Sequence, residues 1–151
     1  ASDVYKRQVN DRVDIAISIN AHGAHVGMDD LPYEQARKML GKKSIIGVSA
    51  SNKDEFAKVK RLKGVDYIGV SAFSSNTKKE MKNYFGLTGL KKCAKATKIP
   101  LIAIGGIKIS DVNSILNQKV HGVAMISSLL KGDIKHNCME VSKIIKSHEK
   151  I

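Results

Sequence analysis

Long apolar runs are missing from this 151-residue sequence. None approaches the roughly 20 residues of a membrane-spanning helix, and no charged-then-apolar signal pattern is recognisable. Cysteine is also scarce: Cys93 and Cys138 stand alone, without the CxxC spacing of a metal or redox motif. We therefore expect a cytoplasmic protein, kept in a reducing compartment, with no membrane partner.

Aromatic and acidic residues are few as well. Aromatics make up 5% of the chain, and the excess of Lys and Arg gives a formal net charge of +12. A basic nucleic-acid-binding module is one explanation of this charge. Base stacking, however, needs aromatic residues interleaved with basic ones, and the lysines are scattered along the chain. A solvated surface around a site for anionic small molecules is favoured, with no nucleic-acid partner.

Short apolar runs that alternate with amphipathic stretches are the main pattern present. Strands are expected before Asn10 and at residues 24–26, 44–48, 67–70, 101–104 and 122–126. Apolar residues spaced three and four apart predict helices at 14–19 and around 56–62, 87–94, 112–116 and 141–145, and Pro32 fits the first turn of another. This alternation predicts one α/β domain with a parallel sheet, either doubly wound or a (β/α)8 barrel.

The opening stretch ASDVYKRQ does not share this pattern. It lacks an apolar period and resembles translated adapter sequence of the kind found at the ends of assembled contigs. We expect residues 1–8 to be non-native and the barrel domain to occupy residues 9–151.

Polar residues and glycines follow the expected strands one after another. Both candidate architectures bind ligands at the carboxyl ends of their strands. The residues found there are Asn10, Asp11, Asp30, Ser49, Ser75, Thr77, Lys78, Gly105, Gly106, Ile126, Ser127 and Ser128. Carboxylates suit magnesium, while hydroxyls, a lysine and glycine amides suit phosphates.

Each of these residues also has a purely structural interpretation. Asp30 and Ser127 could be helix caps, Asp11 could pair with Arg12 or Lys78, and paired glycines are often only a turn. Their co-occurrence at successive strand ends favours a site. His22 and His25 lack a third ligand at metal-binding spacing, and we expect His25 to point into the core or at a backbone carbonyl.

Six segments in order resemble the strand ends of the thiamine-phosphate synthase family: VNDRVDIA, HVG-x-DDLP, GVS, NTKK, AIGGI and GVAMIS. The resemblance implies a (β/α)8 TIM barrel that joins hydroxymethylpyrimidine diphosphate to thiazole phosphate with Mg²⁺, releasing pyrophosphate. The family's first two βα units, with a Gln-x-Arg-x-Lys-like segment, have no counterpart here. The resemblance therefore implies an incomplete barrel, inactive as an isolated fragment.

The resemblance also implies roles for single residues. Asp11 and Asp30 would bind magnesium, and Asn10, Ser49 and Lys78 would bind the pyrimidine diphosphate. Lys78 and Ser49 would have catalytic roles, with Lys78 helping to neutralise the departing diphosphate. The thiazole phosphate would be held by Ser75, Thr77, Gly106, Ile126 and Ser127.

The sequence departs from the family pattern at a few positions. Met28 and Asp29 stand where the family usually has Gln and Glu, and Ser71 replaces a usual glycine. A homologous barrel, the thiazole tautomerase, is the alternative. It uses a histidine where this chain has Ser51, and it tends to lack the Asn10–Asp11 pair. Both features favour the synthase, while the oligomeric state is left open.

Overall fold

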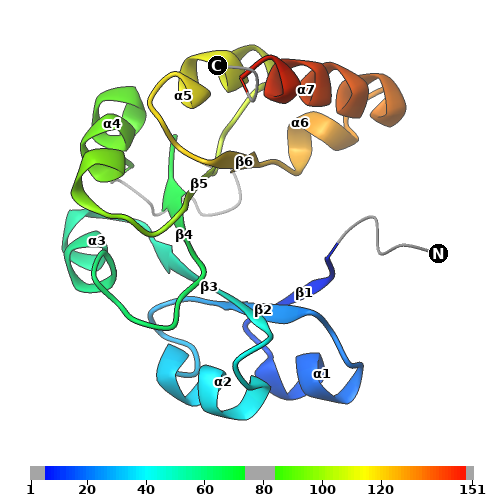
Figure 1. Ribbon diagram of the computed structural model, residues 1–151. Coiled ribbons are helices and arrows are strands. Elements are labelled where there is room, and N and C mark those ends of the chain that lie inside the picture. Colours follow the sequence, from blue (N-terminus) through cyan, green and yellow to red (C-terminus); the bar gives the residue numbers. More distant parts are fainter. Residues whose placement is uncertain (1–5, 74–83, 149–151) are drawn as a thin grey trace.

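A curled parallel sheet forms the centre of the molecule. The computed structural model of the chain describes residues 6–73 and 84–148. Within these residues, six strands pair in sequential order from β1 to β6. The sheet bends into a half-barrel with its helices on the convex side (Figure 1). The strands are β1 (Gln8–Asn10), β2 (Gly23–Val26), β3 (Ile45–Ala50), β4 (Tyr67–Ser71), β5 (Leu101–Ile104) and β6 (Gly122–Ala124).

Helices follow the strands along the chain, as expected for repeated βα units. They are α1 (Val13–Ser18), α2 (Tyr33–Leu40), α3 (Lys53–Val59), α4 (Gly86–Ala96), the 3-10 turn η1 (Ile109–Asp111), α5 (Val112–Leu116), α6 (Ser127–Leu130) and α7 (Ile134–His148). In the part of the chain described, no helix has both the length and the apolar character needed to cross a membrane.

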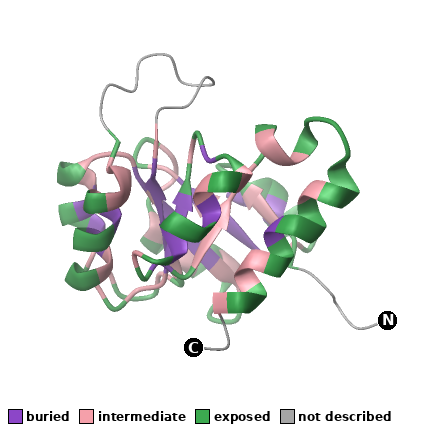
Figure 2. Cartoon of the chain, turned by 90° about the horizontal axis from the view of Figure 1, so that it is seen from above, coloured by how far each residue is buried: buried purple, intermediate pink, exposed green. Residues whose placement is uncertain are grey.

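The hydrophobic core lies between the sheet and its helices. Side chains alternate between the two faces of a strand, and every second residue of the central strands is buried under the helices (Figure 2). These convex-face residues include Ala24, Val26, Ile46, Val48, Ile68, Val70, Leu101 and Ala103. The intervening residues face the concave side, where Asn10, His25, Gly47 and Tyr67 stand in one row across β1 to β4.

The prediction of parallel βα units is confirmed, with some shifts at element ends. β3 continues to Ala50, so Ser49 lies within this strand and not after it. β6 ends at Ala124, and Ile126 takes the N-cap position of α6. Pro32 is the N-cap residue of α2, where its extended ψ of 135° precedes the first turn. Gln8, which the sequence analysis grouped with the opening stretch, is the first residue of β1 and pairs with Gly23 of β2.

Candidate active site

Asn10 and Asp11 occupy the carboxyl end of β1. The Asp11 amide donates a hydrogen bond to the His25 carbonyl oxygen at 2.8 Å, which holds the turn against the neighbouring strand β2. Asp11 has a φ of 65°, the left-handed conformation that Asp tolerates better than most residues. The guanidinium of Arg12 is engaged by Asp14, and this hydrogen bond lowers the Asp14 pKa to about 2. The exposed Asp11 therefore stands at the concave edge on a turn anchored to β2.

Asp30 lies just beyond the end of β2. Its carboxylate accepts a hydrogen bond from the Gly27 amide at 2.7 Å and closes the turn that follows the strand. The helix-cap interpretation of Asp30 is wrong, because α2 begins at Tyr33 and its N-cap residue is Pro32. Asp11 and Asp30 thus follow adjacent parallel strands, as the sequence predicted for the carboxylate pair.

Ser49 belongs to a hydrogen-bonded group on the concave face. His25 Nε2 lies 2.8 Å from Ser49 Oγ, and His25 Nδ1 lies 3.0 Å from the Tyr67 hydroxyl. The His25 and Tyr67 rings stack with centroids 5.4 Å apart, and the Tyr67 hydroxyl also contacts Gln8 Oε1 at 3.1 Å. His25 was expected to face the core or a backbone carbonyl. Its ring instead binds two hydroxyls contributed by β3 and β4.

The surroundings of these rings disfavour charge. Burial lowers the pKa of His25 below its ordinary value, and the nearby negative charge of Asp30 offsets part of that shift. Burial also raises the pKa of the Tyr67 phenol, with a smaller opposing effect from its hydrogen bond to Gln8. A neutral imidazole between two neutral hydroxyls is the arrangement that this environment favours.

Two glycines make room for this group. A Cβ atom at Gly47 would overlap both the Tyr67 ring and the His25 ring. A Cβ atom at Gly69 would lie 3.1 Å from His25 Cε1, tighter than ordinary van der Waals contact. Nothing in the local sequence shows this requirement, because the residues that need the space are contributed by β2 and β4. Sequence reasoning consequently missed His25 and Tyr67 as partners of Ser49.

The paired glycines after β5 both have positive φ, 93° at Gly105 and 61° at Gly106. Glycine adopts this region without the steric cost that a Cβ atom adds. The Gly105 carbonyl accepts a hydrogen bond from the Phe73 amide at 3.2 Å, which ties this turn to the end of β4. Both positions therefore have the backbone conformation of a turn that favours glycine. A glycine in this conformation at position 106 can also present its amide to a phosphate.

The residues after β6 are held beside the glycine turn. Ser128 Oγ donates a hydrogen bond to the carbonyl oxygen of Ile107, so α6 and the segment after β5 lie together. The amide group of Asn137, on α7, donates to the carbonyl oxygens of Leu129 and Lys131 at 3.0 and 2.9 Å. These contacts hold α6 near both of its ends. At its start, Ile126 is 70% exposed and Ser127 is the first helical residue.

Other predicted residues are placed elsewhere or not described. Ser75, Thr77 and Lys78 lie outside the described residues. His22 accepts a hydrogen bond from the Arg7 amide at the amino end of β2, the opposite end from the candidate site. Among residues 6–73 and 84–148, no group of three or more His, Cys, Asp or Glu side chains could hold a metal. A metal ion at the carboxyl ends of β1 and β2 would therefore be bound by the carboxylates of Asp11 and Asp30, with oxygen atoms of a bound substrate or of water.

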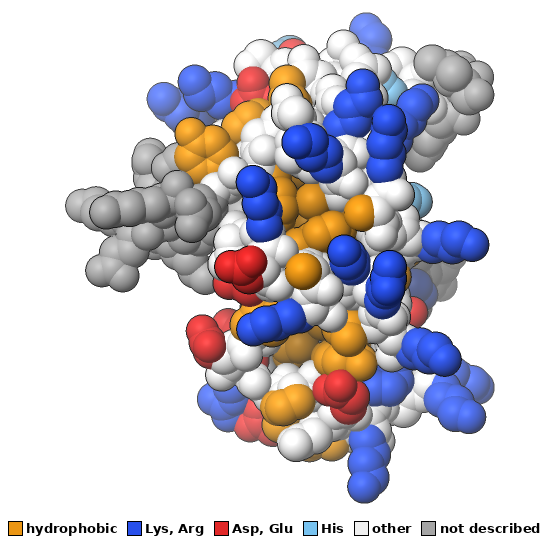
Figure 3. Space-filling model, turned by 90° about the vertical axis from the view of Figure 1, so that its left-hand side faces the viewer, with side chains coloured by type: hydrophobic (Ala, Val, Ile, Leu, Met, Phe, Trp, Pro, Cys, Tyr) orange, Lys and Arg blue, Asp and Glu red, His pale blue; other side chains and the backbone are white. Residues whose placement is uncertain are grey.

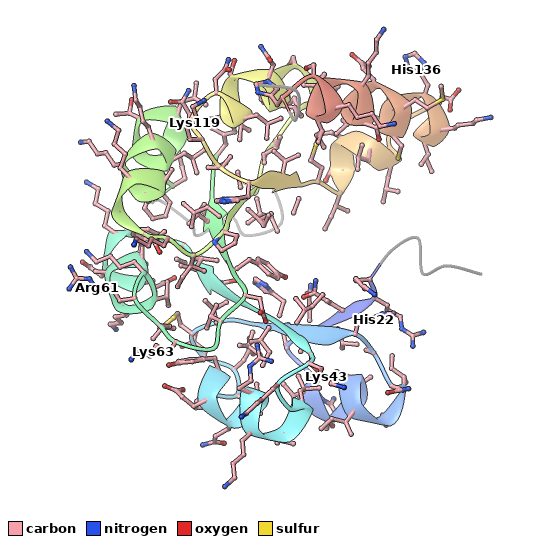
Figure 4. All side chains as sticks on the ribbon, viewed as in Figure 1. His22, Lys43, Arg61, Lys63, Lys119 and His136 are labelled. Carbon is pink, nitrogen blue, oxygen red and sulfur yellow. The ribbon has the colours of Figure 1, made fainter. Side chains whose placement is uncertain are left out.

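Basic side chains are spread over the outside of the molecule. Figure 3 shows Lys and Arg distributed over the convex, helical face, with acidic residues and apolar surface between them. Arg61 and Lys63 are labelled in Figure 4 and lie on the outer side, away from the concave face. This distribution fits the solvated surface that the sequence analysis favoured.

The sequence of this chain is similar to those of several thiamine-phosphate synthases. The chain is 44% identical to the thiamine-phosphate synthase of Clostridium novyi over 83% of its own length and 61% of that protein. It is 41% identical to the thiamine-phosphate synthase of Methanococcus maripaludis strain C6, over 94% of this chain and 68% of that one. The chain thus spans about three fifths to two thirds of the length of these relatives.

A solved structure and a family profile complete the comparison. The thiamine phosphate pyrophosphorylase of Pyrococcus furiosus matches with a TM-score of 0.81 and 34% identity, over 93% of this chain and 67% of that one. A 3-hexulose-6-phosphate synthase, at 15% identity and a TM-score of 0.66, shares the fold alone. The family profile for thiamine monophosphate synthase matches residues 6–129. The chain therefore belongs to the thiamine monophosphate synthase family.

Proposed function

We propose that the protein containing this chain is a thiamine-phosphate synthase, which joins hydroxymethylpyrimidine diphosphate to thiazole phosphate and releases pyrophosphate. One observation carries the proposal. Asn10, Asp11, Asp30, Gly106 and Ser127 come from four different βα units, yet they lie along the carboxyl edge of one curled parallel sheet. Family members named thiamine-phosphate synthase support the same assignment.

Asp11 and Asp30 suit a magnesium ion in this proposal. They follow adjacent strands, and hard carboxylate oxygens are the ligands that Mg²⁺ prefers, together with water and phosphate oxygens. The bond from the Gly27 amide orients the Asp30 carboxylate. When bound, Mg²⁺ would neutralise charge on the departing diphosphate. Asn10 and Ser49 would hold the pyrimidine diphosphate beside this pair, and Lys78 would add a positive charge.

The thiazole phosphate would bind at the neighbouring strand ends. Gly106, Ile126 and Ser127 lie on the two segments that the Ser128–Ile107 hydrogen bond holds together. Ser75 and Thr77, which follow β4 in the sequence, would also contribute. Helix and turn amides at such positions are well suited to phosphate oxygens.

The reaction needs no protein nucleophile. The bond between the pyrimidine methylene carbon and the diphosphate oxygen breaks, and its electron pair leaves with pyrophosphate. The thiazole nitrogen lone pair then forms the new bond to the methylene carbon. The residues named above would orient the two substrates and stabilise charge on the leaving group.

We further propose that two more βα units precede residue 9 in the complete protein and close a (β/α)8 barrel. Two observations support this proposal. The outer strands of the described sheet, β1 and β6, each pair on one side only. Apolar side chains are also exposed next to β6, including Ile126 at 70% and Leu130 at 61%. A protein of this kind would be cytoplasmic, with small-molecule substrates and no nucleic-acid partner.

The test is to restore the missing units. The first 60 or so residues of the Clostridium novyi relative would be joined to residue 9, because two βα units require about that length. Pyrophosphate release is measured with both substrates and Mg²⁺, for the chimera and for this chain alone. We expect release only from the chimera.

The outcomes separate the proposed activity from its alternatives. A folded chimera that releases no pyrophosphate would contradict the proposal. Isomerisation of thiazole phosphate without pyrophosphate release would indicate the tautomerase. Salt-dependent retention on RNA or DNA that survives Gly106→Ala would indicate a nucleic-acid-binding module.

A further inference from the structure

The contact between His25 and Ser49 has no role in the function proposed above. Their side chains are 24 residues apart in sequence and belong to neighbouring strands, with Nε2 and Oγ 2.8 Å apart. On its other nitrogen, His25 meets the Tyr67 hydroxyl at 3.0 Å. The three side chains therefore form one continuous line across β2, β3 and β4, which we call the Tyr67–His25–Ser49 relay.

Proton counting restricts how this relay is arranged. A neutral imidazole has one N–H donor and one lone-pair acceptor. One of the two hydroxyls must therefore donate to the ring while the other accepts from it. A phosphate oxygen near Ser49 can only accept, so the Ser49 proton must go to it and Ser49 Oγ must accept from His25 Nε2–H. His25 Nδ1 is then left as the acceptor for the Tyr67 hydroxyl.

The structure holds the His25 ring in a fixed plane. Stacking on Tyr67 fixes the imidazole plane, and Gly47 and Gly69 leave no Cβ atom that would displace it. The Tyr67 proton has a second acceptor in Gln8 Oε1, at 3.1 Å against 3.0 Å for His25 Nδ1. Gln8→Ala removes this competing acceptor and leaves the Tyr67 proton to His25 Nδ1.

We propose that His25 and Tyr67 are positioning residues that hold the Ser49 hydroxyl as a proton donor toward a phosphate oxygen of the bound diphosphate. The proposal rests on the proposed function for the identity of that ligand. It adds a defined imidazole tautomer, with the proton on Nε2. Neither His25 nor Tyr67 touches the ligand; both act through Ser49.

The first test reads the tautomer directly. Nitrogen NMR of the histidine-labelled restored barrel, joined at residue 8 so that Gln8 is kept, is recorded with inorganic pyrophosphate and Mg²⁺. The pH is 8, above the ordinary imidazole pKa of about 6.5, so that the ring is neutral. We expect His25 to carry its proton on Nε2. Tyr67→Phe removes the donor to Nδ1, so the spectrum should shift toward a mixture of tautomers, whereas Gln8→Ala should leave it unchanged. A proton on Nδ1 in the unaltered chain would overturn the proposal.

The second test measures binding of inorganic pyrophosphate with Mg²⁺ to the restored barrel by calorimetry. His25→Leu should weaken binding about tenfold, the loss expected for one hydrogen bond to a charged group. His25→Asn should restore part of it, because the Asn amide can also donate to Ser49 Oγ. Equal binding by His25→Leu and the unaltered protein would refute a positioning role. If the unaltered restored barrel does not bind pyrophosphate, the proposed function fails at Ser49. If it binds pyrophosphate but carries the His25 proton on Nδ1, the relay alone fails.

Discussion

Arg37 connects α2 to two loops, and its replacement should destabilise the fold more than any change on the exposed surface. Its Nε donates to the Gly64 carbonyl oxygen at 2.9 Å, and one terminal nitrogen donates to the carbonyl oxygens of Gly41 and Ser44. The other terminal nitrogen contacts the Asp66 carboxylate at 2.6 Å. The Arg37 side chain is only 19% exposed.

The magnitude follows from these bonds. Each hydrogen bond to a charged group stabilises by about 1.5–3 kcal/mol when buried, and partial exposure with shared donors reduces the sum. The ion pair itself contributes little, because the Asp66 side chain is 49% exposed. We expect Arg37→Ala to lower the free energy of unfolding by about 2–4 kcal/mol. Arg37→Lys should recover less than half, because an ammonium group cannot reproduce the planar fork of donors.

Urea denaturation followed by circular dichroism measures these changes. Arg61→Ala is the matched control, because Arg61 is exposed on the outer side and should change stability by no more than about 0.5 kcal/mol. If Arg37→Ala and Arg61→Ala unfold at the same urea concentration, the structural role assigned to Arg37 is incorrect. Full recovery by Arg37→Lys would show that charge alone is responsible.

Four further predictions concern the site and the two thiols. Asp30→Asn should retain the fold, since an amide oxygen can still accept from the Gly27 amide, but it should reduce magnesium-dependent pyrophosphate release by the restored barrel at least about tenfold. Gly106→Ala should weaken binding of thiazole phosphate, and it should add about 1–2 kcal/mol of strain at φ 61°. If the variant is destabilised but binds thiazole phosphate normally, Gly106 serves only the turn. At pH 8 a thiol reagent should modify exposed Cys138 and spare buried Cys93, and two rapidly reacting thiols would contradict this. Burial raises the pKa of the Cys93 thiol from 9.0 to about 11. The stability that the neutral buried thiol contributes is therefore complete below pH 9 and is lost as the pH rises toward 11. Cys93→Ala should abolish this part of the alkaline loss of stability in urea titrations.

Local pattern was sufficient to predict the βα units and the chemistry of their ends. An apolar run such as Leu101–Ile104 predicts a strand, because a parallel sheet covered by helices buries apolar side chains. The spacing of Val112, Ile115 and Leu116 predicts a helix with one buried face. Residues directly after such strands must lie at one edge of the sheet. The position of Asp11 and Asp30 on adjacent strands could therefore be inferred without coordinates.

Contacts between distant segments depend on tertiary structure. Position 47 is an example, because nothing in the sequence around Gly47 indicates that a larger residue would not fit there. The packing of His25 and Tyr67 against this glycine is the reason. Strand register places His25 opposite Gly47, and the His25 ring reaches Ser49 two residues further along β3, on the same face of the sheet. Such contacts arise from the relative placement of whole strands, which the periodicity within each segment does not encode.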